Sequence, residues 1–146
     1  MKRWNGWGDD QNDLGMELNR SALAYLRQLI GPATALPDAT LEQVLASVPP
    51  SRLPPHALVS LDPDDRLRHA RGQSLPDWLA LRSGDFGVFP DGVAFPKSAA
   101  EVQELLRYAQ QHDVSLIPYG GGTSVVGHIN QEAGERPVLA VDMTGM

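Results

Sequence analysis

In the first 84 residues, apolar side chains recur at intervals of three and four positions, the spacing of one face of a helix. The first such stripe runs over residues 23–30. Either Asn19 or Ser21 can cap this helix, and Gly31, followed by a proline, ends it. Because one face is apolar, we expect this helix to pack against the rest of the protein.

Three further segments carry the start and stop signals of short helices. Thr40 opens a capping box of the Thr-x-x-Gln type, and apolar positions follow it at helical spacing. The segments after Asp62 and Ser74 each combine a capping residue, a proline in the first turn and an acidic residue near the start. We therefore expect residues 18–84 to form mainly helices, interrupted by a stiff proline-rich connector over residues 49–55.

The pattern changes at residue 92. Short apolar runs over residues 92–96, 114–118 and 137–142 predict three strands. Between the first two, Ser98 with Glu101 has the form of a capping box at the start of a helix of about 14 residues. Strand, helix and strand form a βαβ unit, for which a right-handed connection is expected. The predicted fold class is α+β, with an N-terminal helical section followed by a βαβ-β unit.

Residues 1–17 show neither a helical nor a strand period, and we interpret them as an irregular arm. The arm contains Trp4 and Trp7. Their indole rings either fix the arm to a core by burying ring area or contact a partner or substrate.

Charge and composition narrow the possible functions. The chain has 12 Lys and Arg against 18 Asp and Glu, so its formal charge is 12 − 18 = −6, which excludes a generally basic nucleic-acid binder. It has no Cys, which excludes disulfides and thiolate chemistry. The apolar run of ~18 residues needed by a spanning helix does not occur, and the N-terminus lacks a signal-peptide core. We expect a soluble, cytoplasmic protein.

Two groups of titratable side chains are candidate sites. The four histidines are scattered without ligand spacing, so no metal site is expected. A local group of cationic residues forms either a solvated helix face paired with nearby aspartates or a contact for an anionic ligand or another domain. Its members are Arg66, Arg68, His69, Arg71 and Arg82.

The sharpest candidate site is the glycine-rich loop that follows the second predicted strand. Three consecutive glycines leave the main chain uncovered, so successive N–H groups can converge on an anion such as a diphosphate. The hydroxyl groups of Thr123 and Ser124 add donors. The loop is not a Walker motif, because His128-Ile129 replaces Lys-Ser/Thr, and Val125 breaks the dinucleotide fingerprint. The alternative interpretation is that the glycine run forms only a turn and binds no ligand.

A family resemblance accompanies this loop. Residues 95–102, Leu105-Leu106 and residues 116–124 resemble the start of the FAD-binding domain of the vanillyl-alcohol oxidase/p-cresol methylhydroxylase (PCMH) type, and the likeness covers residues 90–146. It implies an FAD diphosphate held by the loop. The FAD is implied to be non-covalent, because no histidine occupies the position that tethers flavin in covalent members. The cofactor-binding residues that it implies are Pro118, Tyr119, Gly120, Gly121, Gly122, Thr123, Ser124 and Gly127.

The upstream residues narrow the resemblance. Residues 3–8, 68–78 and 82–84 resemble the alkyldihydroxyacetonephosphate-synthase-like branch of this family. The wider group includes D-lactate and glycolate dehydrogenase-like flavoenzymes, so the implied substrate is either a 2-hydroxy acid or an alkyl/acyl-dihydroxyacetone phosphate. Two residues depart from the relatives: His128 replaces a common glycine, and Gly145 replaces a larger, often basic residue.

In this family the flavin domain continues far beyond the glycine loop, and a substrate domain follows it. The resemblance therefore implies the N-terminal fragment of an FAD-dependent oxidoreductase, whose partner is the missing C-terminal part of the same enzyme. No catalytic residue is assigned to this chain, and we expect it to be inactive alone. The alternative function is a non-catalytic anion-binding or assembly module that uses the same loop.

Overall fold

The computed structural model describes residues 3–6, 8, 18–32, 34 and 37–146. Most of the predicted arm over residues 1–17, including Trp7, lies outside the described residues. Trp4 is described, is half-buried and packs against an apolar cluster formed by the helical section. For Trp4, the interpretation as a core anchor is confirmed.

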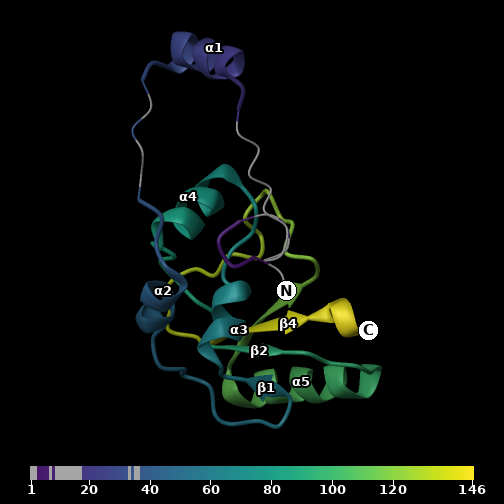
Figure 1. The fold of residues 1–146 in the computed structure, drawn as a ribbon. Coiled ribbons are helices and arrows are strands. Elements are labelled where there is room, and N and C mark those ends of the chain that lie inside the picture. The colour runs from purple at the N-terminus through teal and green to yellow at the C-terminus, as the bar shows by residue number, and fades with distance from the viewer. Residues whose placement is uncertain (1–2, 7, 9–17, 33, 35–36) are drawn as a thin grey trace.

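The described residues form α-helices and a small sheet, so the α+β class is confirmed (Figure 1). No helix in this part of the chain combines the length and apolar character that a bilayer crossing needs. The α-helices are α1 Arg20–Ile30, α2 Leu41–Ser47, α3 Pro63–Arg68, α4 Leu75–Ser83 and α5 Ala99–His112. The strands are β1 Val59–Ser60, β2 Gly92–Ala94, β3 Ser115–Tyr119 and β4 Val138–Asp142, and the 3₁₀ helix η1 covers Met143–Gly145.

The helix starts follow the predicted capping residues. Asn19 caps α1, and Thr40 and Ser74 form reciprocal capping boxes with side chains three residues later. Ser98 caps α5 by accepting the N–H of Glu101. The Glu101 carboxylate accepts the N–H of Lys97 at 2.7 Å instead of that of Ser98, so the predicted capping box is only half formed.

The sheet has the strand order β1-β2-β4-β3. Strands β2, β4 and β3 run parallel, with Ala140 of β4 in register with Val93 on one side and Ile117 on the other. The third predicted strand therefore lies between the two strands of the βαβ unit. Every residue of β4 is buried, as expected for the central strand of a parallel sheet.

The sequence pattern did not predict β1. Val59 and Ser60 pair antiparallel with Ala94 and Val93 and extend the sheet by one edge strand. Two residues are too few to show a strand period, so only the pairing with β2 reveals this strand.

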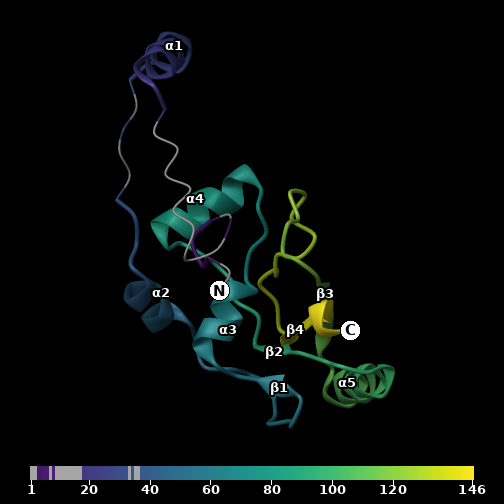
Figure 2. The same ribbon diagram turned by 45° about the vertical axis from the view of Figure 1, so that its right-hand side comes forward.

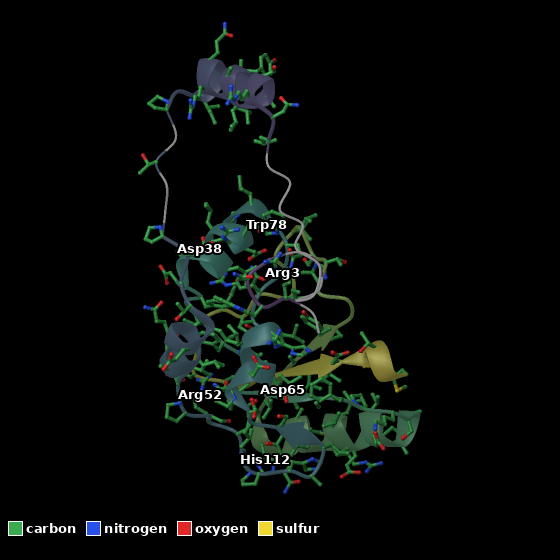
Figure 3. All side chains as sticks on the ribbon, in the orientation of Figure 1. Arg3, Asp38, Arg52, Asp65, Trp78 and His112 are labelled. Carbon is green, nitrogen blue, oxygen red and sulfur yellow. The ribbon has the colours of Figure 1, made fainter. Side chains whose placement is uncertain are left out.

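The expectation that α1 packs against the rest of the protein is wrong. None of its residues is buried, and the side chains of Leu29 and Ile30 are 62% and 76% exposed. Both views show α1 standing apart from the other elements (Figures 1 and 2), and its side chains project into open space (Figure 3). The apolar stripe favours the helix itself, but no partner surface among the described residues covers it.

Two apolar clusters form the core of the described residues. One joins the sheet to α5 and contains Leu53, Ala94, Leu105, Tyr108, Ala109, Val114, Leu139 and Val141. The other lies within the helical section and contains Val44, Leu67, Ala70, Leu81, Phe86 and Phe89. The helical section thus has its own apolar centre beside the sheet.

Candidate cofactor-binding loop

The glycine-rich loop begins where β3 ends, at the carboxyl edge of the parallel strands. Because β2, β4 and β3 are parallel, their carboxyl ends meet at one edge, and ligands of open α/β sheets bind at such edges. Figure 2 shows the loop projecting beyond β3, next to α4 and the segment that precedes it.

The main chain of this loop is available to a ligand. Among the described residues, no acceptor receives a hydrogen bond from the N–H groups of residues 120–124. A Cβ added to Gly120 would meet nothing within 4 Å, and one added to Gly121 would lie 3.7 Å from Cγ2 of Thr123. Gly122 has a φ of 68°, which a residue with a side chain rarely adopts. The loop therefore presents unpaired donors and open space together.

A pocket of about 430 Å³ lies over the loop, within the size range of small-molecule sites. Of the residues implied as cofactor-binding, the pocket includes six and leaves out Tyr119 and Gly127. Its lining contains no Lys or Arg. The lining residues are Pro118, Gly120, Gly121, Gly122, Thr123, Ser124, Val125, Val126, His128 and Ile129.

His128, at a position where the resemblance implies glycine, lies in the pocket wall. Its Nδ1 is 3.1 Å from the Oγ of Ser124. The ring occupies part of the rim, and it is the one titratable side chain among the lining residues.

Tyr119 points away from the pocket. Its side chain is buried, and its hydroxyl donates to the carbonyl of Arg68 at 3.1 Å. Burial, with a smaller contribution from the charge of Asp142, raises the pKa of Tyr119 to about 12. Tyr119 therefore holds the end of β3 against the helical section and contributes no side chain to the pocket.

A second contact fixes the neighbouring strand end. His69 Nε2 lies 2.9 Å from Oδ2 of Asp142, and its Nδ1 lies 2.7 Å from the carbonyl oxygen of Asp65. The other oxygen of Asp142 accepts the N–H and hydroxyl of Thr144. Burial raises the pKa of Asp142, but hydrogen bonds from Thr144 and His69 outweigh it, so the pKa is lowered.

The cationic group proposed from the sequence does not form one surface. The side chain of Arg66 is buried and donates to the carbonyls of Pro49 and Pro90, and His69 is also buried. Arg68 pairs with Asp64, Arg71 lies 3.8 Å from Asp77, and Arg82 pairs with Asp38. These pairs fit the interpretation of helix residues paired with aspartates. No group of three or more metal-ligand side chains occurs in the part of the chain that the structure describes.

Sequence reasoning missed four residues that support the loop. Gly72, Gln73 and Asp77 of the helical section and Asn130 of the loop form a set of contacts behind the pocket. The sequence carried one signal of their importance, the family resemblance of residues 68–78. It did not indicate which side chains meet.

The residues of the loop fit a diphosphate group. Unpaired N–H groups at adjacent positions, two hydroxyl groups and glycines open to the pocket are the features that bind phosphate oxygens without a large countercharge. Among the described residues, no atom outside the neighbouring positions lies within 4 Å of a Cβ built on Gly120.

Comparison with known proteins shows which domain family and which relatives this chain resembles. Residues 90–146 match the family described as FAD binding domain. An alkyldihydroxyacetonephosphate synthase of Dictyostelium discoideum is 37% identical over 56% of this chain and 13% of its own length. The Caenorhabditis elegans protein of the same name is 25% identical over 97% of this chain and 28% of its own length. A mitochondrial D-lactate dehydrogenase [cytochrome] of Arabidopsis thaliana is 46% identical, but over only 27% of this chain and 9% of its own length.

Solved structures show the same relationship. A structure of an alkyldihydroxyacetonephosphate synthase superposes with a TM-score of 0.79 at 26% identity, covering 99% of this chain and 33% of the other. The chain therefore spans about a third of that structure. Residues 90–146 thus match an FAD binding domain, and the chain over nearly its whole length is similar in sequence and fold to alkyldihydroxyacetonephosphate synthases.

Proposed function

We propose that this chain provides the diphosphate-binding part of an FAD site in a flavoprotein of the alkyldihydroxyacetonephosphate synthase type. The observation that carries the proposal is the set of unpaired N–H groups over residues 120–124, at the carboxyl edge of a parallel sheet and under a pocket of about 430 Å³. When bound, FAD would supply the redox-active isoalloxazine ring.

The chain's own part in this function is binding and orientation. The N–H groups of residues 120–124 and the hydroxyls of Thr123 and Ser124 would donate to the phosphate oxygens. Because the pocket lining has no Lys or Arg, directed hydrogen bonds rather than paired charges would provide the affinity. Non-covalent binding follows from the resemblance, because Thr123 and Ser124 stand where covalent members carry the tethering histidine.

The extent of similarity favours the synthase over a 2-hydroxy-acid dehydrogenase. The relatives named alkyldihydroxyacetonephosphate synthase match up to 99% of this chain, whereas the D-lactate dehydrogenase matches 27%. The substrate class that we propose for the whole protein is accordingly an acyl- or alkyl-dihydroxyacetone phosphate. The 2-hydroxy acids remain the second candidate because of that dehydrogenase match.

Calorimetric titration of the purified chain with FAD, ADP and riboflavin tests the cofactor proposal. FAD and ADP share the diphosphate, and riboflavin lacks it. We expect FAD and ADP to bind and to shift the NMR amide signals of residues 120–124, and riboflavin to leave those signals unchanged. Absence of any ADP or FAD binding at millimolar concentration, or binding that leaves these amides unaffected, would contradict the proposal and favour an assembly module.

Activity assays with substrates of both candidate classes test whether this chain catalyses a reaction by itself. We expect the chain with excess FAD to show no turnover, because the pocket that its residues line holds only the diphosphate end of the cofactor. The assays are alkyl exchange on acyl-dihydroxyacetone phosphate and reduction of an artificial electron acceptor with D-lactate or glycolate. Turnover well above that of free flavin would show that the catalytic groups lie within this chain.

A further inference from the structure

The helical section is in direct contact with the second half of the glycine loop. The N–H of Gln73 donates to the carbonyl of Ser124 at 2.6 Å, and the N–H of Gly72 donates to Oδ1 of Asn130 at 3.1 Å. The side-chain amide of Asn130 donates to Oδ1 of Asp77 at 2.7 Å. Two consecutive main-chain N–H groups and one carboxylate thus hold both ends of residues 124–130.

Position 72 favours glycine because the neighbouring atoms leave no room for a side chain. A Cβ at this position would lie 2.4 Å from the carbonyl oxygen of Ser124 and 3.2 Å from Oδ2 of Asp77. Since Gly72 is not among the residues with positive φ, its backbone conformation does not itself require glycine. A side chain here would push the loop away from the helical section.

Asp77 is a rigid support for Asn130. Its side chain is fully buried at the start of α4. Oδ2 accepts the N–H and hydroxyl of Ser74 at 3.0 and 2.6 Å, and Oδ1 accepts from Asn130 and lies 3.8 Å from Nη1 of Arg71. The capping interaction fixes the carboxylate, and the carboxylate in turn fixes the amide of Asn130.

The contact with Ser124 also orients the next peptide N–H. In a trans peptide the carbonyl of one residue and the N–H of the next point in opposite directions. Because the Ser124 carbonyl points to Gln73, the N–H of Val125 is turned away from the helical section. Val125 lines the pocket, and its N–H has no acceptor among the described residues.

We propose that Gly72, Gln73, Asp77 and Asn130 are positioning residues for the cofactor, which set the loop so that the N–H of Val125 joins those of residues 120–124 as a diphosphate donor. This inference rests on the proposed function. It assigns the helical section a part in cofactor binding, through a partly buried network whose residues do not line the pocket.

The Gly72→Ala variant tests the inference, with Gly134→Ala as the matched control. Gly134 also lacks positive φ, but a Cβ there meets nothing within 4 Å. ADP binding to the full chain is measured by calorimetry, folding by thermal unfolding, and loop geometry by NMR amide shifts. We expect Gly72→Ala to weaken ADP binding about tenfold, or about 1.4 kcal/mol, and Gly134→Ala to bind as the unsubstituted chain does.

The Val125 amide provides the readout that a purely structural role would not change. In the unsubstituted chain, ADP should shift the amide signals of Gly121, Gly122 and Val125. In Gly72→Ala, the Val125 response should be lost while the glycine responses remain. Unchanged ADP affinity with a retained Val125 response overturns the inference and leaves the proposed function intact. If the unsubstituted chain binds neither ADP nor FAD, the proposed function itself fails.

Exchanging the aspartate and asparagine at positions 77 and 130 tests the inference if Gly72→Ala does not fold. Asn130→Asp places two carboxylates together and should weaken ADP binding. Adding Asp77→Asn restores a donor and an acceptor between the two positions and should recover most of the affinity. A folded double variant that binds ADP no better than Asn130→Asp alone would contradict the positioning role.

Discussion

Arg52 holds both carboxylate oxygens of Asp91, with Nε 2.8 Å from Oδ1 and Nη2 2.7 Å from Oδ2. The same carboxylate accepts the N–H of Val138, the first residue of β4. The guanidinium also donates to carbonyls of the segment that leads into this strand, those of Gly134, Glu135 and Arg136. The proline-rich connector is thereby fixed to the start of the central strand, at the end of the sheet opposite the glycine loop.

Replacing Asp91 should weaken this connection in a pH-dependent way. Burial raises the pKa of Asp91, but hydrogen bonds from Arg52 and Val138 outweigh it, so the folded-state pKa lies below the usual value. The resulting stability is present above the unfolded-state pKa of about 3.9 and is lost as the pH falls through the folded-state pKa. We expect Asp91→Asn to lower the free energy of unfolding by about 1–3 kcal/mol at neutral pH.

Urea denaturation at neutral and acidic pH measures this effect. The difference between Asp91→Asn and the unsubstituted chain should shrink in acid, although Asp142, whose pKa is also lowered, will keep some pH dependence in both. Asp113→Asn is the matched control, because the Asp113–Arg136 pair is exposed and asparagine tolerates the left-handed backbone of that residue. An equal loss of stability in both variants would contradict the prediction.

Tyr119 should control stability at alkaline pH. Its folded-state pKa is raised to about 12, so the unfolded chain loses this proton first and the free energy of unfolding falls as the pH rises above about 10. The shift corresponds to a loss of up to about 2.7 kcal/mol between about pH 10 and 12. Tyr119→Phe should reduce this slope, and should cost about 1 kcal/mol at neutral pH because its hydrogen bond to Arg68 is lost.

Tyr108→Phe is the comparison variant for this measurement. Burial also raises the pKa of Tyr108, and its hydroxyl donates to the carbonyl of Pro54 at 2.7 Å. Because Tyr119 is the residue with the large shift, its variant should flatten the alkaline limb of the stability curve more. The reverse order would show that the end of β3 is more hydrated than its buried tyrosine indicates.

Two glycines of the loop should respond differently to substitution. Gly121→Val should impair FAD retention and ADP binding with little effect on thermal stability, because the added side chain extends into the open pocket. Gly122→Ala should lower the free energy of unfolding by about 1–2 kcal/mol, because its φ of 68° is unfavourable for alanine. Thermal unfolding and retained flavin absorbance separate the two effects, and unchanged flavin retention in Gly121→Val would count against this loop as the cofactor site.

Substitutions in α1 and α5 should differ in their cost. Leu26 is 37% exposed on α1, whereas Leu105 on α5 is 1% exposed within the core. We expect Leu26→Ala to change the free energy of unfolding by at most about 0.5 kcal/mol and Leu105→Ala to cost about 2–5 kcal/mol. Chemical denaturation of the two variants is the measurement. A large cost for Leu26→Ala would mean that α1 packs in solution.

The local elements and the position of the glycine loop follow from residues that are close together in the chain. Capping residues and helical spacing identified α2, α4 and α5, because these signals act within one or two turns. Apolar runs identified β2, β3 and β4 to within a few residues, and the glycine run after Pro118 located the loop at a strand end. These features depend on the main chain and on neighbours close in sequence.

The remaining features depend on contacts between residues that are far apart in the chain. The tertiary structure inserts β4 between β2 and β3, adds β1 to the edge of the sheet and leaves α1 without a covering surface. Asp77 illustrates how far prediction from the local sequence reaches. Its capping of α4 through Ser74 follows from three residues of sequence, but its bond to Asn130 joins residues 53 positions apart. That contact exists only because the folded path of the chain brings the helical section behind the glycine loop, and no local pattern encodes that path.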